Sequence, residues 1–191
     1  SCSPSRGAII TGQEIWRLGE AAQLFSAVPN ELSKLSFPLL LENNGYYVGY
    51  TQKGWAPNDF NVYEWEKYPL GQSYTEELIE PLTERIVNNN YFGNFKAFLD
   101  AKKSEDPFFF WCGTSEPHRA FKRGSGLTSG IDLDKIRVPG FLPDVLAIKQ
   151  DISDYLLEIK WADQHLKKML DLLETEGELE NTIIIVTSDN G

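Results

Sequence analysis

The chain has 191 residues and a formal net charge of −10, with 41% hydrophobic and 24% charged residues. These values suit an ordinary globular domain or part of a larger one. The acidic balance argues against a surface that binds nucleic-acid phosphates, and no apolar run approaches the roughly 20 residues of a membrane-spanning helix. Two cysteines, Cys2 and Cys112, are too few for a disulfide framework or a zinc site. We therefore expect no nucleic-acid partner and no membrane span.

The first part of the chain alternates helical and strand-like patterns. A helical apolar pattern over residues 34–43 ends at an Asn-Asn-Gly sequence, which favours a helix end. Residues 46–51 are rich in aromatic and β-branched side chains and predict a strand. Residues 53–74 combine Gly, Pro, Asn and Asp without periodicity, which predicts an irregular loop. A helix up to about residue 103 and a buried strand over residues 108–112 follow.

The second part contains a Gly- and Pro-rich loop over residues 113–144, then the longest predicted helix, residues 152–176. Residues 182–187 predict a fully buried strand of the kind that parallel sheets use. Helices that alternate with buried strands imply a layered α/β fold. The predicted apolar face of the long helix consists of Ile152, Leu156, Ile159, Leu166, Met169, Leu170 and Leu173.

Both ends of the chain are unusual for a natural protein. The sequence opens at Ser1 without an initiating Met or a signal segment, and it stops at Gly191 directly after the predicted strand. An α/β fold normally continues from such a strand into a functional loop. We therefore expect an internal fragment of a larger protein.

The sequence Cys2-Ser3-Pro4-Ser5-Arg6 carries the first candidate chemistry. It resembles the Cys-x-Pro-Ser-Arg motif of type I sulfatases, and Ala8 to Gly12 resemble that family's continuation. The resemblance implies that Cys2 is oxidised to formylglycine, whose hydrate attacks sulfur and then expels sulfate. Arg6 would lie one helical turn away and could hold the hydrate and a bound anion. Without this resemblance, Cys2 would be read as an inert thiol near a helix start.

A second motif follows the predicted strand at residues 46–51. The run from Gly49 to Trp55 resembles the sulfatase segment in which a strand ends in Gly-Lys-x-His, and this match implies that Lys53 binds the sulfate group. Here Gln52 replaces the usual Gly and Trp55 stands where the His is expected, which leaves the base for breakdown of the sulfated intermediate in question. By itself, Lys53 would be read as a solvated loop lysine.

The two histidines differ in their expected positions. His118 follows Pro117 in a loop after the strand at residues 108–112, which resembles the family's Pro-His pair and implies a general acid or a contact to the scissile oxygen. His165 lies inside the long predicted helix beside Gln164 and Lys167, where we expect a surface residue. Catalytic groups are common at strand ends, so we favour His118 by about four to one.

A fourth motif closes the chain. The strand at residues 182–187 runs into Ser188-Asp189-Asn190-Gly191, which resembles the family's Ser-Asp-His/Asn-Gly segment. The match implies that Asp189 and Asn190 are calcium ligands, since a hard divalent cation selects oxygen donors. The ion would offset the charge of sulfate. A tight turn is the alternative use of an Asp-Asn-Gly sequence.

Together the four motifs imply a sulfatase of alkaline-phosphatase-like architecture, an α/β/α sandwich with a mostly parallel central sheet, incomplete at both ends. Residues 1–191 would form part of a single catalytic domain that lacks the first strand, its Asp-Asp metal ligands, and a later Lys or Arg of the sulfate pocket. The resemblance is strongest to the heparan N-sulfatase-like branch. It implies Ca²⁺, formylglycine made from Cys2 by a formylglycine-generating enzyme, and export to periplasm, lysosome or outside. We expect the isolated fragment to bind calcium poorly and to be inactive.

The implied substrate is a sulfate ester or N-sulfate on a sulfated carbohydrate. Attraction of a polyanion to an acidic protein must then come from local cations, and nearby aromatic side chains could stack on sugars or form loop core. These cations are Arg6, Lys53, Arg119, Lys122 and Arg123, and the aromatic residues are Trp55, Phe60, Tyr63 and Trp65.

Three other classes of protein remain open. They are a catalytically degenerate protein that binds sulfated glycans, a phosphatase or phosphodiesterase of the same fold, and a redox or structural thiol protein.

Overall fold

The computed structural model describes residues 1–55 and 67–190, which divide into two compact units. Unit 1 comprises Ser1–Thr75, Asn94–Gly113 and Asn181–Gly191, and unit 2 comprises Glu76–Gly93 and Thr114–Glu180. Unit 1 is thus assembled from three segments that are far apart in the sequence.

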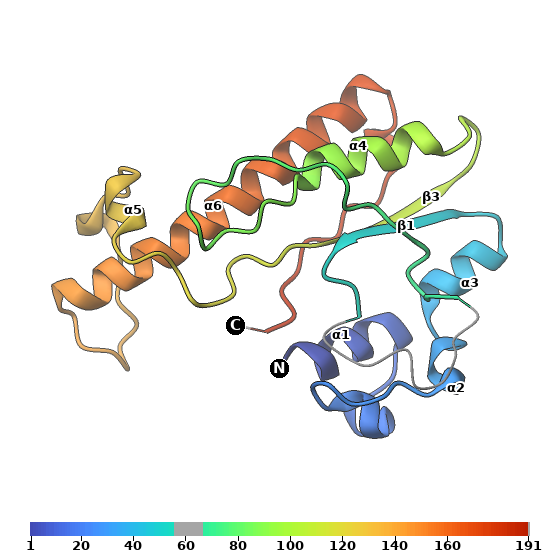
Figure 1. The fold of residues 1–191 in the computed structure, drawn as a ribbon, viewed down its shortest axis with the longest axis horizontal. Helices are drawn as coiled ribbons and strands as arrows, with labels where there is room; N and C mark the ends of the chain where they lie inside the picture. The colour runs from blue at the N-terminus through green and yellow to red at the C-terminus, as the bar shows by residue number, and fades with distance from the viewer. Residues whose placement is uncertain (56–66, 191) are drawn as a thin grey trace. The chain divides into compact units, whose positions relative to one another are not determined.

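Unit 1 contains a parallel sheet in the strand order β2-β1-β3, where β1 is Tyr47–Gln52, β2 is Gln72–Ser73 and β3 is Phe108–Gly113 (Figure 1). The strands predicted at residues 46–51 and 108–112 are confirmed as β1 and β3, but the prediction that residues 108–112 are buried is wrong: Phe108 to Trp111 are only partly buried and Cys112 is exposed. Their register pairs Tyr47 with Phe108 and Gln52 with Gly113, so both strands end at the same edge of the sheet. Loops that leave this edge are the usual place for a functional site in α/β folds.

The described residues of unit 1 include the helices α1 (Cys2–Thr11), α2 (Asn30–Ser33), α3 (Phe37–Asn43) and the part of α4 (Tyr91–Ala101) that begins at Asn94. Short 3₁₀ turns at Ile15–Arg17 and Gly19–Ala22 follow α1. Phe98 of α4 packs directly on Gly49 of β1, where a Cβ atom would lie 2.7 Å from its ring. A glycine in the strand therefore allows the helix to approach the sheet closely.

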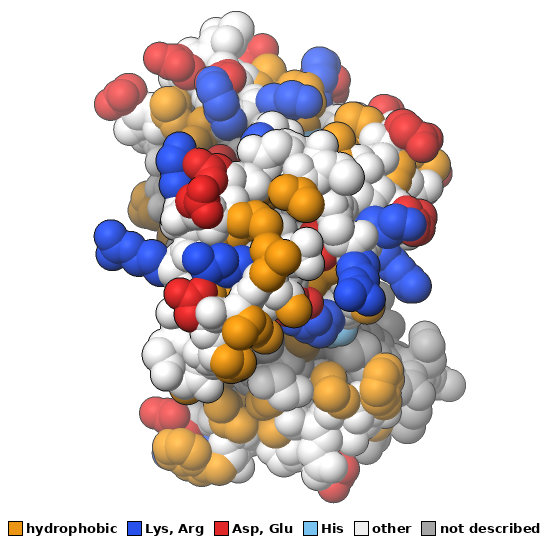
Figure 2. Space-filling view, turned by 90° about the vertical axis from the view of Figure 1, so that its left-hand side faces the viewer, with side chains coloured by type: hydrophobic (Ala, Val, Ile, Leu, Met, Phe, Trp, Pro, Cys, Tyr) orange, Lys and Arg blue, Asp and Glu red, His pale blue; other side chains and the backbone are white. Residues whose placement is uncertain are grey.

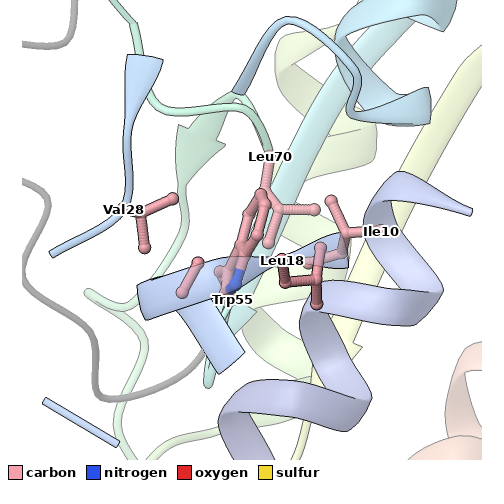
Figure 3. Close-up of a cluster of buried hydrophobic side chains, with 6 residues drawn as sticks. Ile10, Leu18, Val28, Trp55 and Leu70 are labelled. Atoms are coloured by element: carbon pink, nitrogen blue, oxygen red, sulfur yellow. The ribbon is translucent and has the colours of Figure 1, made fainter. Parts of the chain in front are cut away.

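The core of unit 1 surrounds Trp55, which is completely buried (Figure 3). Its indole packs among Ile10, Leu18, Val28 and Leu70. Trp55 is therefore a core residue and does not present a face for sugar stacking. The other aromatic residues considered for stacking, Phe60, Tyr63 and Trp65, lie outside the described residues.

Unit 2 is built on α6 (Leu146–Thr175), a 30-residue helix, with the short helix α5 (Ser125–Thr128) packed against it. The buried carboxylate of Asp154 fixes α5, because it accepts 2.8 Å bonds from the N–H groups of Gly124 and Gly126. A 3₁₀ turn at Leu133–Lys135 lies in the same connection, and another at Leu179–Asn181 follows α6. The predicted long helix is confirmed, although it begins six residues before the predicted start at residue 152.

The buried face of α6 differs from the predicted apolar face, and the prediction that His165 is a surface residue is wrong. His165 is 2% exposed, and its Nδ1 accepts a 3.2 Å bond from the Phe92 N–H. A backbone donor from another segment satisfies the imidazole, which hydrophobicity alone does not reveal. The buried residues of α6 are Ser153, Asp154, Leu157, Glu158, Trp161, His165, Met169 and Leu173.

The prediction of a buried strand over residues 182–187 is also wrong for the described structure. These residues form no strand with any described segment, and the side chains of Ile183 and Ile185 are 89% and 81% exposed. A strand of this composition is stable only where a neighbouring strand pairs with its backbone and where its apolar faces are covered. The described residues provide neither.

Two further features concern the surface charges and the lengths of the helices. On the face shown in Figure 2, Lys and Arg side chains are interspersed with Asp and Glu rather than gathered into one broad patch. Among the described residues, no helix has both the length and the apolar character needed to cross a membrane.

Candidate active site

Cys2 is the first residue of α1, in unit 1. Proline in the first helical turn and Gly12, with φ of 63°, at the end define this helix locally. The first N–H groups of a helix have no intrahelical acceptors, so Cys2 lies at its partly positive end. Arg6 follows one turn later on the same side, as the spacing predicts.

Lys53 reaches Cys2 from the end of β1. Its Nζ lies 3.0 Å from the Cys2 Sγ, and its backbone N–H donates a 2.8 Å bond to the Gly113 carbonyl of β3. The preceding residue, Gln52, has φ of 61°, in the left-handed region that favours glycine. This conformation explains why the matching family pattern has Gly at this position.

Arg6 is 6% exposed and connects separate segments of unit 1. Its Nε donates a 2.6 Å bond to the Gly54 carbonyl, its Nη2 donates to the Lys53 carbonyl, and its Nη1 lies 2.9 Å from Asp189 Oδ2. A buried guanidinium with partners on all three nitrogens is fixed in orientation. Arg6 therefore has both a structural and an electrostatic role in this site.

Asp189 supplies the negative charge of the site. Its Oδ2 lies 2.9 Å from Arg6 Nη1 and 3.4 Å from Lys53 Nζ. Burial alone would raise the pKa of Asp189, but the bond to Arg6 and the charge of Lys53 outweigh burial and lower it. Two cations thus share one carboxylate beside the Cys2 thiol, which leaves one net positive charge for an anionic ligand.

Asn190 lies beside the same thiol, with its Nδ2 3.8 Å from Cys2 Sγ and 2.6 Å from Asp189 Oδ1. Asp189 and Asn190 offer the oxygen donors that calcium prefers, but the ion takes six to eight of them. The described residues contain no group of three or more His, Cys, Asp or Glu side chains placed to hold a metal. Two side chains are fewer than the six to eight oxygen ligands that calcium takes, so a calcium site here would need further ligands.

His118 lies in unit 2, in the loop that follows β3. Its side chain is exposed, and its Nδ1–H donates a 2.6 Å bond to the Arg119 carbonyl, which leaves Nε2 as the other ring nitrogen. The buried carboxylate of Glu116 anchors this loop by accepting bonds from Tyr91 Oη at 2.6 Å and the Val87 N–H at 2.9 Å. The role of His118 stays a prediction.

Two of the three predicted cations of unit 2, Arg119 and Lys122, have acidic partners. Arg119 forms a bidentate pair with Asp151, and Lys122 pairs with Glu84. Exposed pairs of this kind contribute little to stability. They also reduce the positive charge available to a polyanion.

Sequence reasoning missed two residues that contact the site from β3. The indole N–H of Trp111 donates a 3.0 Å bond to the Lys53 carbonyl, and Gly113 lies directly against that carbonyl. The only sequence signal for them was the predicted strand, whose register beside β1 places residue 113 next to residue 52.

Comparisons with known proteins identify the family to which this sequence is similar. The model of the family described as Sulfatase matches residues 1–191. The human protein N-sulphoglucosamine sulphohydrolase is 28% identical over 221 aligned positions, which cover 100% of this chain and 41% of that protein. An uncharacterised sulfatase of Escherichia coli K12, YdeN, is 23% identical, with 98% of this chain and 38% of that protein covered. The chain thus spans about two fifths of the length of these relatives.

A solved structure shows the same fold. It is a Bacteroides thetaiotaomicron chain from work on the metabolism of multiple glycosaminoglycans, and it superposes with a TM-score of 0.62. The alignment covers 92% of this chain and 46% of that chain at 16% sequence identity. This likeness supports the predicted α/β architecture with a parallel sheet.

Proposed function

Because the chain belongs to the sulfatase family, we propose that it forms part of a formylglycine-dependent hydrolase of sulfate esters or N-sulfates on a sulfated carbohydrate. The observation that carries this proposal is the 3.0 Å approach of Lys53 Nζ to Cys2 Sγ beside Arg6 and Asp189. The four residues come from three distant parts of the sequence, and they gather at the end of a helix and a strand.

The site fits a formylglycine at position 2. This side chain supplies, when hydrated, one hydroxyl to attack sulfur and a second to expel sulfate. Lys53 and Arg6 would bind the sulfate oxygens and stabilise the negative charge that grows on them. The amino end of α1 would add the partial positive charge of its free N–H groups.

By family resemblance, His118 is the proposed acid for the leaving group, and Nε2 is the ring nitrogen that would carry the proton, since Nδ1 is bonded to the Arg119 carbonyl. Its anchor at Glu116 would keep the loop in one conformation. Trp55 contributes nothing to this chemistry, because it is buried where the family pattern has His.

Three further parts of the proposal rest on family membership. Asp189 and Asn190 would bind Ca²⁺ together with ligands outside the described residues. A formylglycine-generating enzyme would act on Cys2 during biosynthesis, and the protein would be exported to the periplasm, a lysosome or the exterior. Residues 1–191 would be one part of a single catalytic domain.

The first test is the mass of the Cys2 peptide from the full-length protein that contains this chain, made in a host with formylglycine-generating capacity; the later tests use the same full-length protein. We expect an aldehyde at Cys2, together with release of sulfate from a sulfated saccharide. Cys112 is the matched control, because it is an exposed thiol of the same chain without the motif and should stay unmodified. An intact Cys2 thiol would remove the nucleophile and contradict the proposal.

One observation favours a second candidate, a protein that binds sulfated glycans without turnover. The position of the expected His holds a core Trp, which is 0% exposed and cannot act as a base. This candidate predicts an unmodified Cys2 and saccharide binding without sulfate release. The same mass measurement and a binding assay separate the two candidates.

A further inference from the structure

The backbone carbonyl of Lys53 is the common acceptor of two side chains in unit 1. Arg6 Nη2 donates to it from α1, and the Trp111 indole N–H donates to it from β3 at 3.0 Å. A carbonyl oxygen has two lone pairs, so these two donors satisfy its hydrogen-bonding capacity. The carbonyl, and with it the start of the Lys53 side chain, is held between the helix and the strand.

Trp111 also contacts the second cation of the site. The Arg6 Cζ lies 5.3 Å from the centroid of the Trp111 ring, within the range of a cation–π interaction. The same indole thus contacts Arg6 through its face and Lys53 through its edge.

Gly113 leaves the space that this arrangement needs. A Cβ atom at Gly113 would overlap the Lys53 carbonyl oxygen and would lie 2.6 Å from Arg6 Nη2. The Gly113 carbonyl in turn accepts the Lys53 N–H at 2.8 Å. The end of β3 therefore fixes both backbone polar groups of Lys53.

We propose that Trp111 is a positioning residue, which holds Lys53 and Arg6 in the relative placement that binds the sulfate group. The inference rests on the proposed function, in which these two cations bind sulfate. Trp111 itself does not touch the thiol through any described contact, and it acts through the Lys53 carbonyl and the Arg6 guanidinium. Loss of the indole N–H would free the Lys53 backbone on one side and let its ammonium group move away from Cys2.

The test compares sulfate binding and turnover of the protein with those of Trp111→Phe. This variant keeps an aromatic ring under Arg6 but removes the donor to Lys53. We expect its dissociation constant for inorganic sulfate to rise about tenfold and its kcat/KM for a sulfated saccharide to fall by a similar factor. A dissociation constant refers to the folded molecules, so a purely structural role would lower the folded fraction and leave that constant unchanged.

Two further variants control for packing. Replacement of Trp111 by β-(3-benzothienyl)alanine keeps the ring shape and removes only the N–H. This variant should show the same loss of sulfate affinity and of kcat/KM, and it tests the proposal even if Trp111→Phe folds poorly. Phe109→Leu removes apolar volume from the same face of β3, against the same core, without touching a donor, because phenylalanine has none. It should bind sulfate and turn over as the parent does.

The outcomes separate this inference from the proposed function. Parental sulfate affinity in both Trp111 variants, with turnover in the parent, would overturn the positioning role and leave the function intact. If the parent protein releases no sulfate and both Trp111 variants bind sulfate more weakly than it does, the positioning role is supported and the hydrolase proposal is contradicted. A parent that neither binds sulfate nor releases it would overturn both.

Discussion

The Arg6 guanidinium and the Asp189 carboxylate form an ion pair at 2.9 Å, although 183 positions separate them in the sequence. The same carboxylate oxygen lies 3.4 Å from Lys53 Nζ. An internal anion therefore occupies the two cations that would bind sulfate. Any ligand anion at this site competes with Asp189 for them.

This competition predicts the effect of Asp189→Asn. In the presence of a chelator, the variant should bind inorganic sulfate about threefold to tenfold more tightly than the parent, because both cations lose their internal partner. Isothermal titration calorimetry measures the change. Asp151→Asn is the matched control, since Asp151 pairs with an exposed arginine of unit 2. Weaker sulfate binding by Asp189→Asn would contradict the competition.

Lys53→Met should abolish turnover with little effect on folding. The variant removes the cation closest to the Cys2 Sγ, and losing one preorganised charge of this kind costs about 10²- to 10³-fold in kcat. Steady-state sulfate release measures the loss, and circular dichroism reports the fold. Lys96→Met, at an exposed lysine that pairs with Asp100, should behave as the parent does. Unchanged turnover in Lys53→Met would remove Lys53 from the site.

Sequence patterns predicted the elements whose residue composition is typical of their secondary structure. Strand β1 was predicted from its aromatic and β-branched side chains, and β3 was predicted from a continuous apolar run. The two-residue strand β2 carries no such pattern. On α6, polar residues such as Asp154 and His165 are buried because distant backbone donors satisfy them, and hydrophobicity does not encode those donors.

The candidate site was predicted through resemblance more than through physics. The motifs identified Cys2, Arg6, Lys53 and Asp189, and the structure places them together. Neither the ion pair between Arg6 and Asp189 nor the contact of Trp111 could be foreseen, because each depends on which segments meet in three dimensions. The contact of Trp111 with Lys53 depends on the register between β3 and β1, and this register cannot be predicted from the sequence of either strand alone.

Tyr91→Phe should destabilise unit 2 by about 1–3 kcal/mol. Its hydroxyl donates a 2.6 Å bond to the buried Glu116 carboxylate and accepts a 3.0 Å bond from the Ser115 N–H. Removing the hydroxyl leaves the buried Glu116 carboxylate and the partly buried Ser115 N–H with one partner fewer. Urea unfolding measures the change, and Tyr155→Phe, at a side chain 38% exposed, should change stability by less than about 0.5 kcal/mol. Equal stability of the two variants would contradict the role of Tyr91.

Two buried groups of α6 predict opposing pH effects on stability. Burial, assisted by the charge of Glu116, raises the pKa of Glu158 from 4.5 to about 7. Burial, assisted by the charge of Lys168, lowers the pKa of His165 from 6.5 to about 4. The Glu158 Oε1 is buried and has no hydrogen-bond partner among the described residues, which agrees with a neutral carboxyl group.

The signs follow from proton binding. Between pH 4.5 and 7 the unfolded chain releases the Glu158 proton while the folded protein keeps it, so this contribution to stability falls as pH rises. Between pH 4 and 6.5 the unfolded chain binds a proton at His165 while the folded protein does not, so this contribution rises with pH. Over pH 4.5–6.5 the two contributions largely cancel.

In Glu158→Gln, the contribution of His165 to the pH dependence of stability should no longer be cancelled by that of Glu158. Because glutamine does not titrate, the free energy of unfolding of the variant, relative to the parent, should increase with pH from 4.5 to 6.5 and continue to increase to about 7, by up to about 1.4 kcal/mol per pH unit. His165→Asn is the complementary variant, since its amide oxygen can accept the Phe92 N–H without titrating, and its relative stability should fall over the same interval. Urea unfolding at half-unit pH steps measures both slopes. Parallel pH profiles for the parent and both variants would show that neither group changes its pKa on folding.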